Sequence, residues 1–349
     1  MLIDQHTIYT QVDPIEIKGT VMVNNLSLPL VLKPKINNPT PNDRLAFVTD
    51  HKNELLHLVN LHGAVLLRGW GKSSNIDFSN ITHALEKDNN FNMSCSAGPR
   101  IEVAPRVFTA NEAPPEDKIP FHHEMAQCDN PPAFVLFFCN TPSSSGGNTP
   151  LVSSYQACKF LRDHYPDTAE KLVSKGVQYI RVLPKNTDPT NALGKSWKDT
   201  YMTSDKLEVE QIMNKQGQLF SWHGNDFLKT ISKKMSTIIP HYNGGEVFFA
   251  AAETTFKLGK KKIDVSCPSK AICFGDGSEL DDNTVNALLK LGKFMENTST
   301  TWQWESGDVL IIDNATVMHA RNDFIPPRKI LASLIGKLYI NDELKYIIK

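Results

Sequence analysis

The sequence predicts a mainly β protein with flanking helices, in which short strands form a jelly-roll core. Many apolar runs are short and end at Gly, Pro, Asn or Asp, which is typical of strands joined by turns. The helical patterns do not alternate regularly with these strands, as a doubly wound parallel sheet requires. The chain has 349 residues, of which 40% are apolar, so it can bury a sizeable core.

Four segments show the apolar spacing of helices, namely residues 50–62, 75–88, 155–176 and 278–298. Gly63 is expected to end the first helix, and Pro166 is expected to divide the third into two. Acidic residues in the first turn favour the fourth helix, because they complement the positive end of the helix dipole.

Short apolar runs outside these helices predict strands. They cover residues 19–34, 64–70, 177–184, 218–224, 246–256, 301–320 and 329–340. We expect a single domain over residues 1–349, with residues 1–45 as an N-terminal extension packed on it.

The charge and the cysteine pattern narrow the class of protein. The formal net charge is -1 and the pI is about 6.8, which does not favour a nucleic-acid partner, because neutralising phosphates requires a basic face. The chain starts without an apolar leader, and its longest apolar run, residues 133–139, is far shorter than a membrane span. We therefore expect a cytoplasmic protein without a membrane partner. The cysteines form no CxxC pair and are expected to be reduced, mostly buried thiols: Cys95, Cys128, Cys139, Cys158, Cys267 and Cys273.

A histidine and a carboxylate two positions apart suggest a metal site. Of eleven histidines, only His122 is followed at that spacing by a carboxylate, Glu124, and chance alone predicts about one such pair. In an extended strand the two side chains share a face, and His123 points away and is more simply explained as exposed. The third ligand is expected to be His319, which follows a second apolar strand.

Two imidazoles and one carboxylate are the ligands of a facial triad, which leaves adjacent positions on Fe(II) open. The same residue types also bind catalytic zinc. The residue types alone therefore leave both metals open.

Several motifs carry a family resemblance. IPFHHEMAQ (119–127), HGAVLLRGW (62–70), GGNTPLVSS (146–154) and GDVLIIDNATVMHARNDF (307–324) followed by PPRKILASL (326–334) occur in one order. Together they resemble the clavaminate synthase-like proteins of the TauD/TfdA group, as does FTANEAPP (108–115). The metal carboxylate is usually aspartate in that group, and glutamate is the variant of the clavaminate synthase branch. The resemblance covers roughly residues 50–338.

The resemblance implies a double-stranded β-helix, or jelly-roll, with a helical insert between Glu124 and His319. It implies that His122, Glu124 and His319 bind iron, and that Thr149 and Arg328 bind 2-oxoglutarate. Arg328 follows His319 by nine residues, which is shorter than the usual interval. The neighbouring Lys329 is therefore an alternative, although a planar guanidinium pairs better with a carboxylate. Asn111 and Arg68 lie in family-like segments and are lesser candidates for pocket positions.

The implied activity is an Fe(II)- and 2-oxoglutarate-dependent dioxygenase that uses O₂ to oxidise a small-molecule substrate and releases succinate and CO₂. Glu124 favours hydroxylation, desaturation or cyclisation, because halogenating relatives lack this carboxylate. Sulfonate-using relatives carry an arginine where this chain has Ala332, so we do not expect an anionic substrate to be held in that way. Two alternatives are a non-catalytic jelly-roll binding protein and a zinc-dependent hydrolase with the same ligands.

Overall fold

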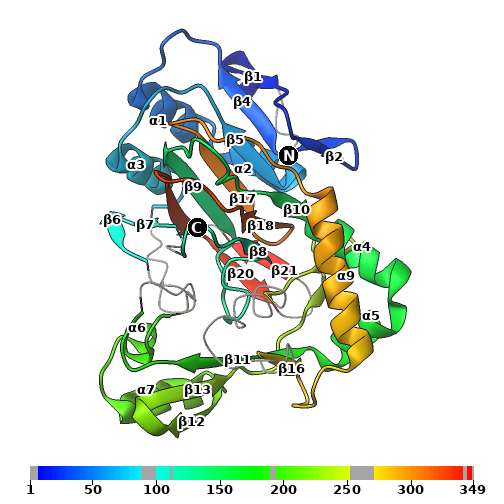
Figure 1. Ribbon diagram of the computed structural model, residues 1–349. Coiled ribbons are helices and arrows are strands. Elements are labelled where there is room, and N and C mark those ends of the chain that lie inside the picture. The colour runs from blue at the N-terminus through cyan, green and yellow to red at the C-terminus, as the bar shows by residue number, and fades with distance from the viewer. Residues whose placement is uncertain are drawn as a thin grey trace.

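The computed structural model describes residues 7–87, 100–110, 113–188, 194–251, 271–340 and 344–347. Its centre consists of an eight-stranded sheet and a three-stranded sheet (Figure 1). The strands of the large sheet, in spatial order, are β1 (Val12–Ile15), β4 (Leu30–Pro34), β5 (Ala64–Leu67), β17 (Val309–Asp313), β9 (Phe134–Thr141), β19 (Lys329–Ile335), β7 (Val107–Thr109) and β6 (Glu102–Ala104). The small sheet has the order β10 (Leu151–Ser153), β18 (Val317–Arg321) and β8 (Ile119–His122).

The two faces of the large sheet serve different cores, because successive side chains along a strand point to opposite sides. On the central strand β9, Phe134, Leu136 and Phe138 belong to the core shared with the N-terminal helices. Phe137 and its alternate neighbours face the other way and share a core with residues of the small sheet. The inner face of the large sheet is thus covered by β10, β18 and β8.

Three helices cover the outer face: α1 (Pro41–Asp50), α2 (Lys52–His62) and α3 (Asn75–Leu85). Thr40 and Ser74 form capping boxes at the starts of α1 and α3, which satisfies free backbone N–H groups there. Gly63 follows α2 with a φ of 79°, a left-handed conformation that glycine adopts readily. The predicted end of this helix is therefore confirmed.

The N-terminal strands extend the large sheet. β4 pairs in parallel with β5, and β1 pairs antiparallel with β4 at the edge. The remaining short strand pairs are β2 (Val21–Val23) with β3 (Leu26–Leu28), β14 (Ile238–Pro240) with β15 (Glu246–Phe248), and β20 (Lys337–Ile340) with β21 (Leu344–Ile347). Two 3₁₀ turns are η1 (Ile8–Thr10) and η3 (Gly224–Asp226).

The segment between β10 and β17 contains the helical insert that the resemblance implies. Its first helices are α4 (Ser154–His164) and α5 (Pro166–Lys175), divided at Pro166 as predicted. A four-stranded sheet follows, formed by β12 (Leu219–His223), β13 (Phe227–Ile231), β11 (Val177–Leu183) and β16 (Ile272–Phe274). The two short helices α6 (Trp197–Tyr201) and α7 (Lys206–Lys215) were not predicted.

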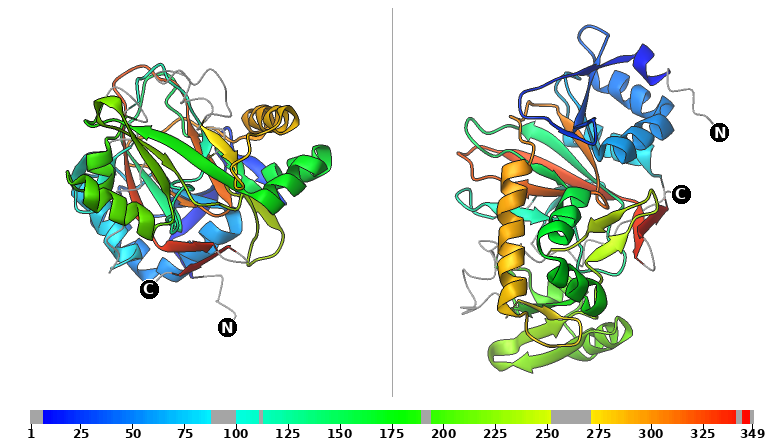
Figure 2. Two further views of the ribbon diagram at one scale, coloured as in Figure 1. Left: turned by 90° about the horizontal axis from the view of Figure 1, so that it is seen from below. Right: turned by 90° about the vertical axis from the view of Figure 1, so that its right-hand side faces the viewer.

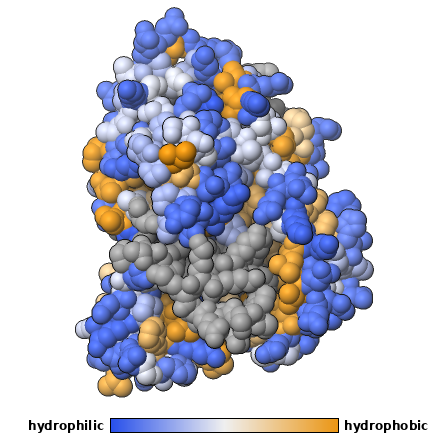
Figure 3. Space-filling view, in the orientation of Figure 1, coloured by the Kyte–Doolittle hydropathy of each residue, from blue (hydrophilic) through white to orange (hydrophobic). Residues whose placement is uncertain are grey.

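The helices α6 and α7 pack on β12 and β13 around a small core of their own, formed by Leu183, Trp197, Val209, Met213 and Leu228. Figures 1 and 2 show this lobe at the end of the molecule opposite α1 and α3. On the face shown in Figure 3, the described surface is largely hydrophilic, and its apolar residues are separated into small patches.

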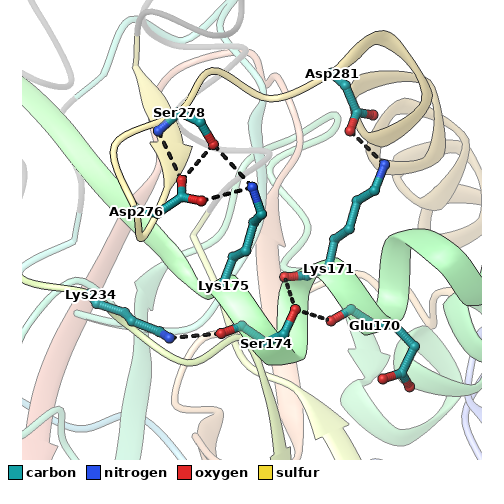
Figure 4. Close-up of polar contacts among 8 residues, drawn as sticks. All are labelled: Glu170, Lys171, Ser174, Lys175, Lys234, Asp276, Ser278 and Asp281. Carbon is teal, nitrogen blue, oxygen red and sulfur yellow. Dashed lines mark hydrogen bonds and ion pairs between the residues drawn. The ribbon is translucent and has the colours of Figure 1, made fainter.

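Helix α9 (Asp282–Thr298) packs beside α4 and α5. Figure 4 shows the polar contacts that join α5 to the segment before α9. Lys175 pairs with Asp276 at 2.8 Å, and Lys171 pairs with Asp281 at 2.7 Å. Asp281 also caps α9, because its Oδ1 accepts the backbone N–H of Thr284 at 2.8 Å.

The remaining sequence predictions concern the cysteines, the strand over residues 246–256 and membrane-spanning helices. Cys128, Cys139, Cys158 and Cys273 are buried free thiols as expected, whereas Cys95 and Cys267 lie outside the described residues. The strand expected over residues 246–256 ends at Phe248, and its last five residues are not described. Within the described ranges, no helix is long and apolar enough to cross a membrane.

The cap of α9 gives a stability prediction. Asp281→Ala should lower the free energy of unfolding by about 1 kcal/mol, because it removes an N-cap acceptor, while Asp282→Ala, one position on, should cost only about 0.3 kcal/mol. The pKa of Asp281 is lowered to about 2, first by its hydrogen bond with Lys171. This stabilisation should therefore be present at neutral pH and be lost as the pH falls from 3.8, the ordinary aspartate value, through about 2. Urea unfolding of the variants at pH 7 and pH 3 measures both effects, and equal losses for the two variants would contradict the assignment of the cap.

Candidate metal centre

The pairing of β8 with β18 brings two histidines together. In this antiparallel pair His122 lies opposite His319, although the two residues are far apart in the sequence. Their ring centroids are 4.4 Å apart. β18 is the middle strand of the small sheet, so His319 is held by strands on both sides.

Glu124 completes a compact group of possible ligands. His122, Glu124 and His319 each offer one donor atom, and these atoms all lie within 4.8 Å of one another. Glu124 Oε2 is 3.8 Å from His319 Nε2, a separation too long for a hydrogen bond. Two imidazole nitrogens and a carboxylate at this spacing fit a divalent cation of the iron or zinc type.

The local backbone differs from the sequence prediction. β8 ends at His122, so Glu124 lies in the following turn rather than in the same extended strand, and Met125 has a φ of 57°. The turn is held by Asn314, whose Oδ1 accepts the backbone N–H of Glu124 at 2.8 Å. Asn314 Nδ2 donates to the carbonyl oxygens of Glu124 and Pro132. A side-chain amide therefore fixes the backbone position from which the carboxylate projects.

Both histidines are in the protonation state that a metal needs. Burial is the main cause that lowers the pKa of His122, and it lowers the pKa of His319 well below the ordinary value. His122 Nδ1 lies 2.9 Å from the carbonyl oxygen of Pro120, an acceptor, so this nitrogen carries the proton and Nε2 has a free lone pair. Neutral imidazoles can bind a metal ion without first releasing a proton.

An arginine that the sequence analysis missed lies against the carboxylate. Arg100 Nη2 donates to Glu124 Oε1 at 2.8 Å, and both side chains are largely buried. Arg100 follows Gly98 and Pro99 and belongs to no recognised motif. Its proximity to Glu124 depends on the tertiary fold, so the sequence offered no signal for it.

Arg328 directly precedes β19 and is held by Gly147 of the GGNT segment. Its Nε donates to the carbonyl oxygen of Gly147 at 2.8 Å, and its guanidinium carbon lies 5.3 Å from the centre of the Phe324 ring. Burial, followed by the charge of Arg321, lowers the pKa of Arg328 to about 10, so the group stays cationic at neutral pH. Lys329 is exposed instead, as expected for adjacent residues on opposite faces of a strand.

Thr149 lies two residues beyond Gly147 and is buried, with 3% of the residue exposed. Its Oγ1 accepts a hydrogen bond from Trp304 Nε1 at 3.2 Å. Leu151, on the same face of this extended segment, pairs directly with His319. Thr149 lies close to Gly147 in the chain, and Arg328 donates to the carbonyl oxygen of Gly147. This segment leads into β10, which pairs with the strand that carries His319.

Comparison with known proteins decides the family. The family described as taurine catabolism dioxygenase TauD, TfdA family matches residues 32–334. The clavaminate synthase-like protein At3g21360 of Arabidopsis thaliana is 35% identical over 310 residues, which cover 87% of this chain and 92% of that protein. The chain belongs to the TauD/TfdA dioxygenase family.

More distant relatives agree. The dapdiamide synthesis protein DdaC of Enterobacter agglomerans is 25% identical over 291 residues, which cover 80% of this chain and 84% of that protein. The crystal structure of PvcB from Pseudomonas aeruginosa superimposes with a TM-score of 0.54 at 15% identity and covers 96% of this chain and 95% of that one. This TauD/TfdA protein is therefore an Fe(II)- and 2-oxoglutarate-dependent dioxygenase, with O₂ as the expected co-substrate.

His123 corrects one expectation about this dioxygenase. The side chain was expected to be exposed, but it is fully buried between the small sheet and the insert. Its Nε2 lies 2.7 Å from Ser154 Oγ, and its Nδ1 accepts the backbone N–H of Ala250 at 3.3 Å. The prediction that His123 points away from His122 and Glu124 assumed a solvated outer face, and the insert covers that face.

The lesser candidates of the dioxygenase lie outside the ligand group or outside the described part of the chain. Arg68 pairs with Asp308 at 2.5 Å and with Glu305 at 3.1 Å. Asn111 is not among the described residues.

The contact between Gly147 and Arg328 gives a prediction for this dioxygenase. A Cβ atom at Gly147 would lie 2.7 Å from Arg328 Cδ and 2.9 Å from Arg328 Nε, so Gly147→Ala must displace the guanidinium. We expect the 2-oxoglutarate concentration at half-maximal turnover to rise by about 10-fold, as for a lost hydrogen bond to a charged group. Succinate release by the iron-loaded enzyme measures this concentration.

The matched control is Gly277→Ala. Gly277 has a φ of 83°, close to the 71° of Gly147, but a Cβ atom there meets nothing within 4 Å. The control reproduces the backbone strain without the clash, and its 2-oxoglutarate requirement should stay unchanged. Equal requirements in the two variants would mean that the clash with Arg328 does not weaken 2-oxoglutarate binding.

Proposed function

We propose that the protein oxidises an aliphatic C–H bond of a small-molecule substrate, by hydroxylation, desaturation or cyclisation, and converts 2-oxoglutarate to succinate and CO₂. In this proposal His122, Glu124 and His319 hold the iron, and Thr149 and Arg328 hold 2-oxoglutarate. We also interpret the large sheet and the small sheet as the two halves of a jelly-roll, because their facing sides share one core.

The proximity of the two residue groups is the observation that carries the proposal. His319 on β18 lies near Glu124, and β18 also pairs with β10 along one of its edges. The chain just before β10 contains Gly147 and Thr149, and Gly147 in turn holds Arg328. A dicarboxylate would suit this arrangement, because it could meet the ligand group with one end and the partly buried Arg328 with the other.

The residues divide the work as follows. Iron, when bound, supplies the activation of O₂ that no side chain can provide. Arg328 pairs with the far carboxylate of 2-oxoglutarate, and the Thr149 hydroxyl donates to the same group while its oxygen accepts from Trp304. Asn314 fixes the turn that carries Glu124, and His122 is oriented by the carbonyl oxygen of Pro120. Apolar residues of the shared core keep water away from this region.

The names of the relatives support a small metabolite as substrate. DdaC is named for dapdiamide synthesis, and the Arabidopsis protein is named for its likeness to clavaminate synthase. We infer a small-molecule substrate for this chain by analogy with them.

A zinc-dependent hydrolase or a non-catalytic binding protein could use the same ligands. The partly buried Arg328, which donates to Gly147 of the GGNT segment, favours the dioxygenase, because neither alternative requires a cation for a dicarboxylate co-substrate. Anaerobic loading with Fe(II) separates the three functions. A visible absorption band on addition of 2-oxoglutarate, followed by succinate release in air, is expected of the dioxygenase alone.

The ligand assignment predicts the behaviour of single variants. His122→Ala and His319→Ala should each lower iron retention after desalting and reduce succinate release by at least about 100-fold, the upper end of the loss caused by removing an outer-shell partner. His83→Ala, an exposed residue of α3, is the control and should behave like the wild type. Undiminished succinate formation in either ligand variant would exclude that histidine as an iron ligand.

The co-substrate assignment distinguishes two neighbouring cations. Arg328→Ala should raise the 2-oxoglutarate requirement by about 100-fold or more, since losing one partner of a buried ion pair costs about 3–5 kcal/mol. Lys329→Ala should change it less than about 2-fold, because exposed pairs contribute little. Titration of 2-oxoglutarate against succinate release decides between them, and the reverse pattern would transfer the role to Lys329.

A further inference from the structure

Arg100 reaches the metal centre from the segment that leads into β6. Its Nη2 donates to Glu124 Oε1 at 2.8 Å, and its side chain is only 11% exposed. The other carboxylate oxygen, Oε2, is the one that lies 3.8 Å from His319 Nε2. Arg100 therefore engages one oxygen of Glu124 and leaves the other toward the histidine.

The second terminal nitrogen of Arg100 meets no acceptor among the residues that the structure describes. Arg100 Nη1 is buried and has no hydrogen-bond partner within those ranges. By contrast, both terminal nitrogens of the buried Arg321 donate to backbone carbonyl oxygens. A buried N–H group of a charged side chain without an acceptor is costly, so few persist in native proteins unless a ligand completes them.

The charges around the ligand group leave a positive excess. The charge of Fe(II) is balanced by the two carboxylates of 2-oxoglutarate. Glu124 balances one of the two cations, Arg100 and Arg328, which leaves one positive charge uncompensated within the group of residues assigned here. An uncompensated charge in a largely buried site is unfavourable, and a singly charged anion would remove it.

We propose that Arg100 determines substrate specificity by binding a carboxylate of the substrate through Nη1, while Nη2 holds Glu124. This inference rests on the proposed function, because it assumes a metal ion at His122, Glu124 and His319. The substrate class is then a small organic acid whose carboxylate lies next to the metal ligand set. A carboxylate fits better than a phosphate dianion, because only one positive charge is uncompensated.

The guanidinium is required for both tasks. Its two terminal nitrogens lie in one plane and can donate in different directions at the same time. A lysine at this position carries all three of its N–H donors on one nitrogen, so a lysine held at Glu124 cannot also reach the position of the second guanidinium nitrogen. Arg100→Lys should therefore keep Glu124 in place and lose the substrate contact, which makes it a more selective test than removal of the charge.

The experiment uses the full chain loaded with Co(II) and 2-oxoglutarate without O₂. Propionate and benzoate are titrated against the Co(II) absorption spectrum, and propionamide and benzamide serve as uncharged counterparts. In the wild type, the carboxylates should bind at least about 10-fold more tightly than the amides, the effect of one hydrogen bond to a charged group. Arg100→Lys and Arg100→Gln should lose this preference and still take up Co(II). Lys118→Gln removes an exposed positive charge just before β8, with a side chain 69% exposed, and should behave like the wild type.

The outcomes separate the two proposals. Equal binding of carboxylates and amides by the wild type would overturn the role of Arg100. The same conclusion would follow if Arg100→Lys kept the full preference for carboxylates. If His319→Ala took up as much Co(II) as the wild type, the ligand assignment itself would fail, and the inference about Arg100 would fall with it. If Arg100→Gln loses Co(II) because Glu124 is misplaced, its ligand preference cannot be measured. The preference of Arg100→Lys for carboxylates over amides then decides the role of Arg100.

Discussion

The site depends on one constraint, the register in which β8 pairs with β18. This register places His122 opposite His319, and a shift by one residue would turn one of the two imidazoles to the other face of the small sheet. Because β18 is the middle strand, a second register, in which Leu151 of β10 lies opposite His319, sets the position of β10 and, through it, of Thr149. The large sheet brings β19 and Arg328 to the same region. Strand β9 pairs with β19, and the ring centroid of Phe137 on β9 lies 5.1 Å from that of His319. Residues from four distant parts of the chain thus converge on a framework of backbone hydrogen bonds.

The side chains at the centre are held mainly by contacts with the backbone. Asn314 fixes the turn after His122, the carbonyl oxygen of Pro120 orients His122, and the carbonyl oxygen of Gly147 orients Arg328. Backbone groups move less than long side chains, so they hold ligands in one geometry at a small cost in conformational entropy. The insert contributes in another way, because it buries His123 and closes the outer side of the small sheet. The dioxygenase chemistry of the family therefore requires only a few polar side chains in an otherwise apolar core.

Much of this arrangement could be predicted from the sequence where local patterns determine it. The helix that ends at Gly63 and the helix pair divided at Pro166 follow from backbone preferences of single residues. The grouping of His122, Glu124 and His319 was predicted from the HxE spacing and from a histidine after a second apolar strand. The order of the family motifs strengthened this prediction, since the HxE pair alone is expected by chance. Arg100, Asn314 and the burial of His123 were missed, and each depends on contacts between segments far apart in the chain. Helices α1, α6 and α7 were missed. Helix α6 has only five residues, and α6 and α7 pack on a small core of their own that forms only in the folded chain.

The edges of the large sheet have a consequence for the behaviour of the protein in a crowded solution. A long sheet with open edges can pair with strands of other molecules and aggregate. Here one edge strand, β1, contains Pro14, which lacks a backbone N–H, and the exposed Asp13. The opposite edge strand, β6, has only three residues, begins with the exposed Glu102 and is interrupted by an irregular register with β7. Both ends of the sheet thus oppose strand addition, and the N-terminal strands, which contribute no residue to the metal centre, protect one edge of the main sheet from pairing with other molecules.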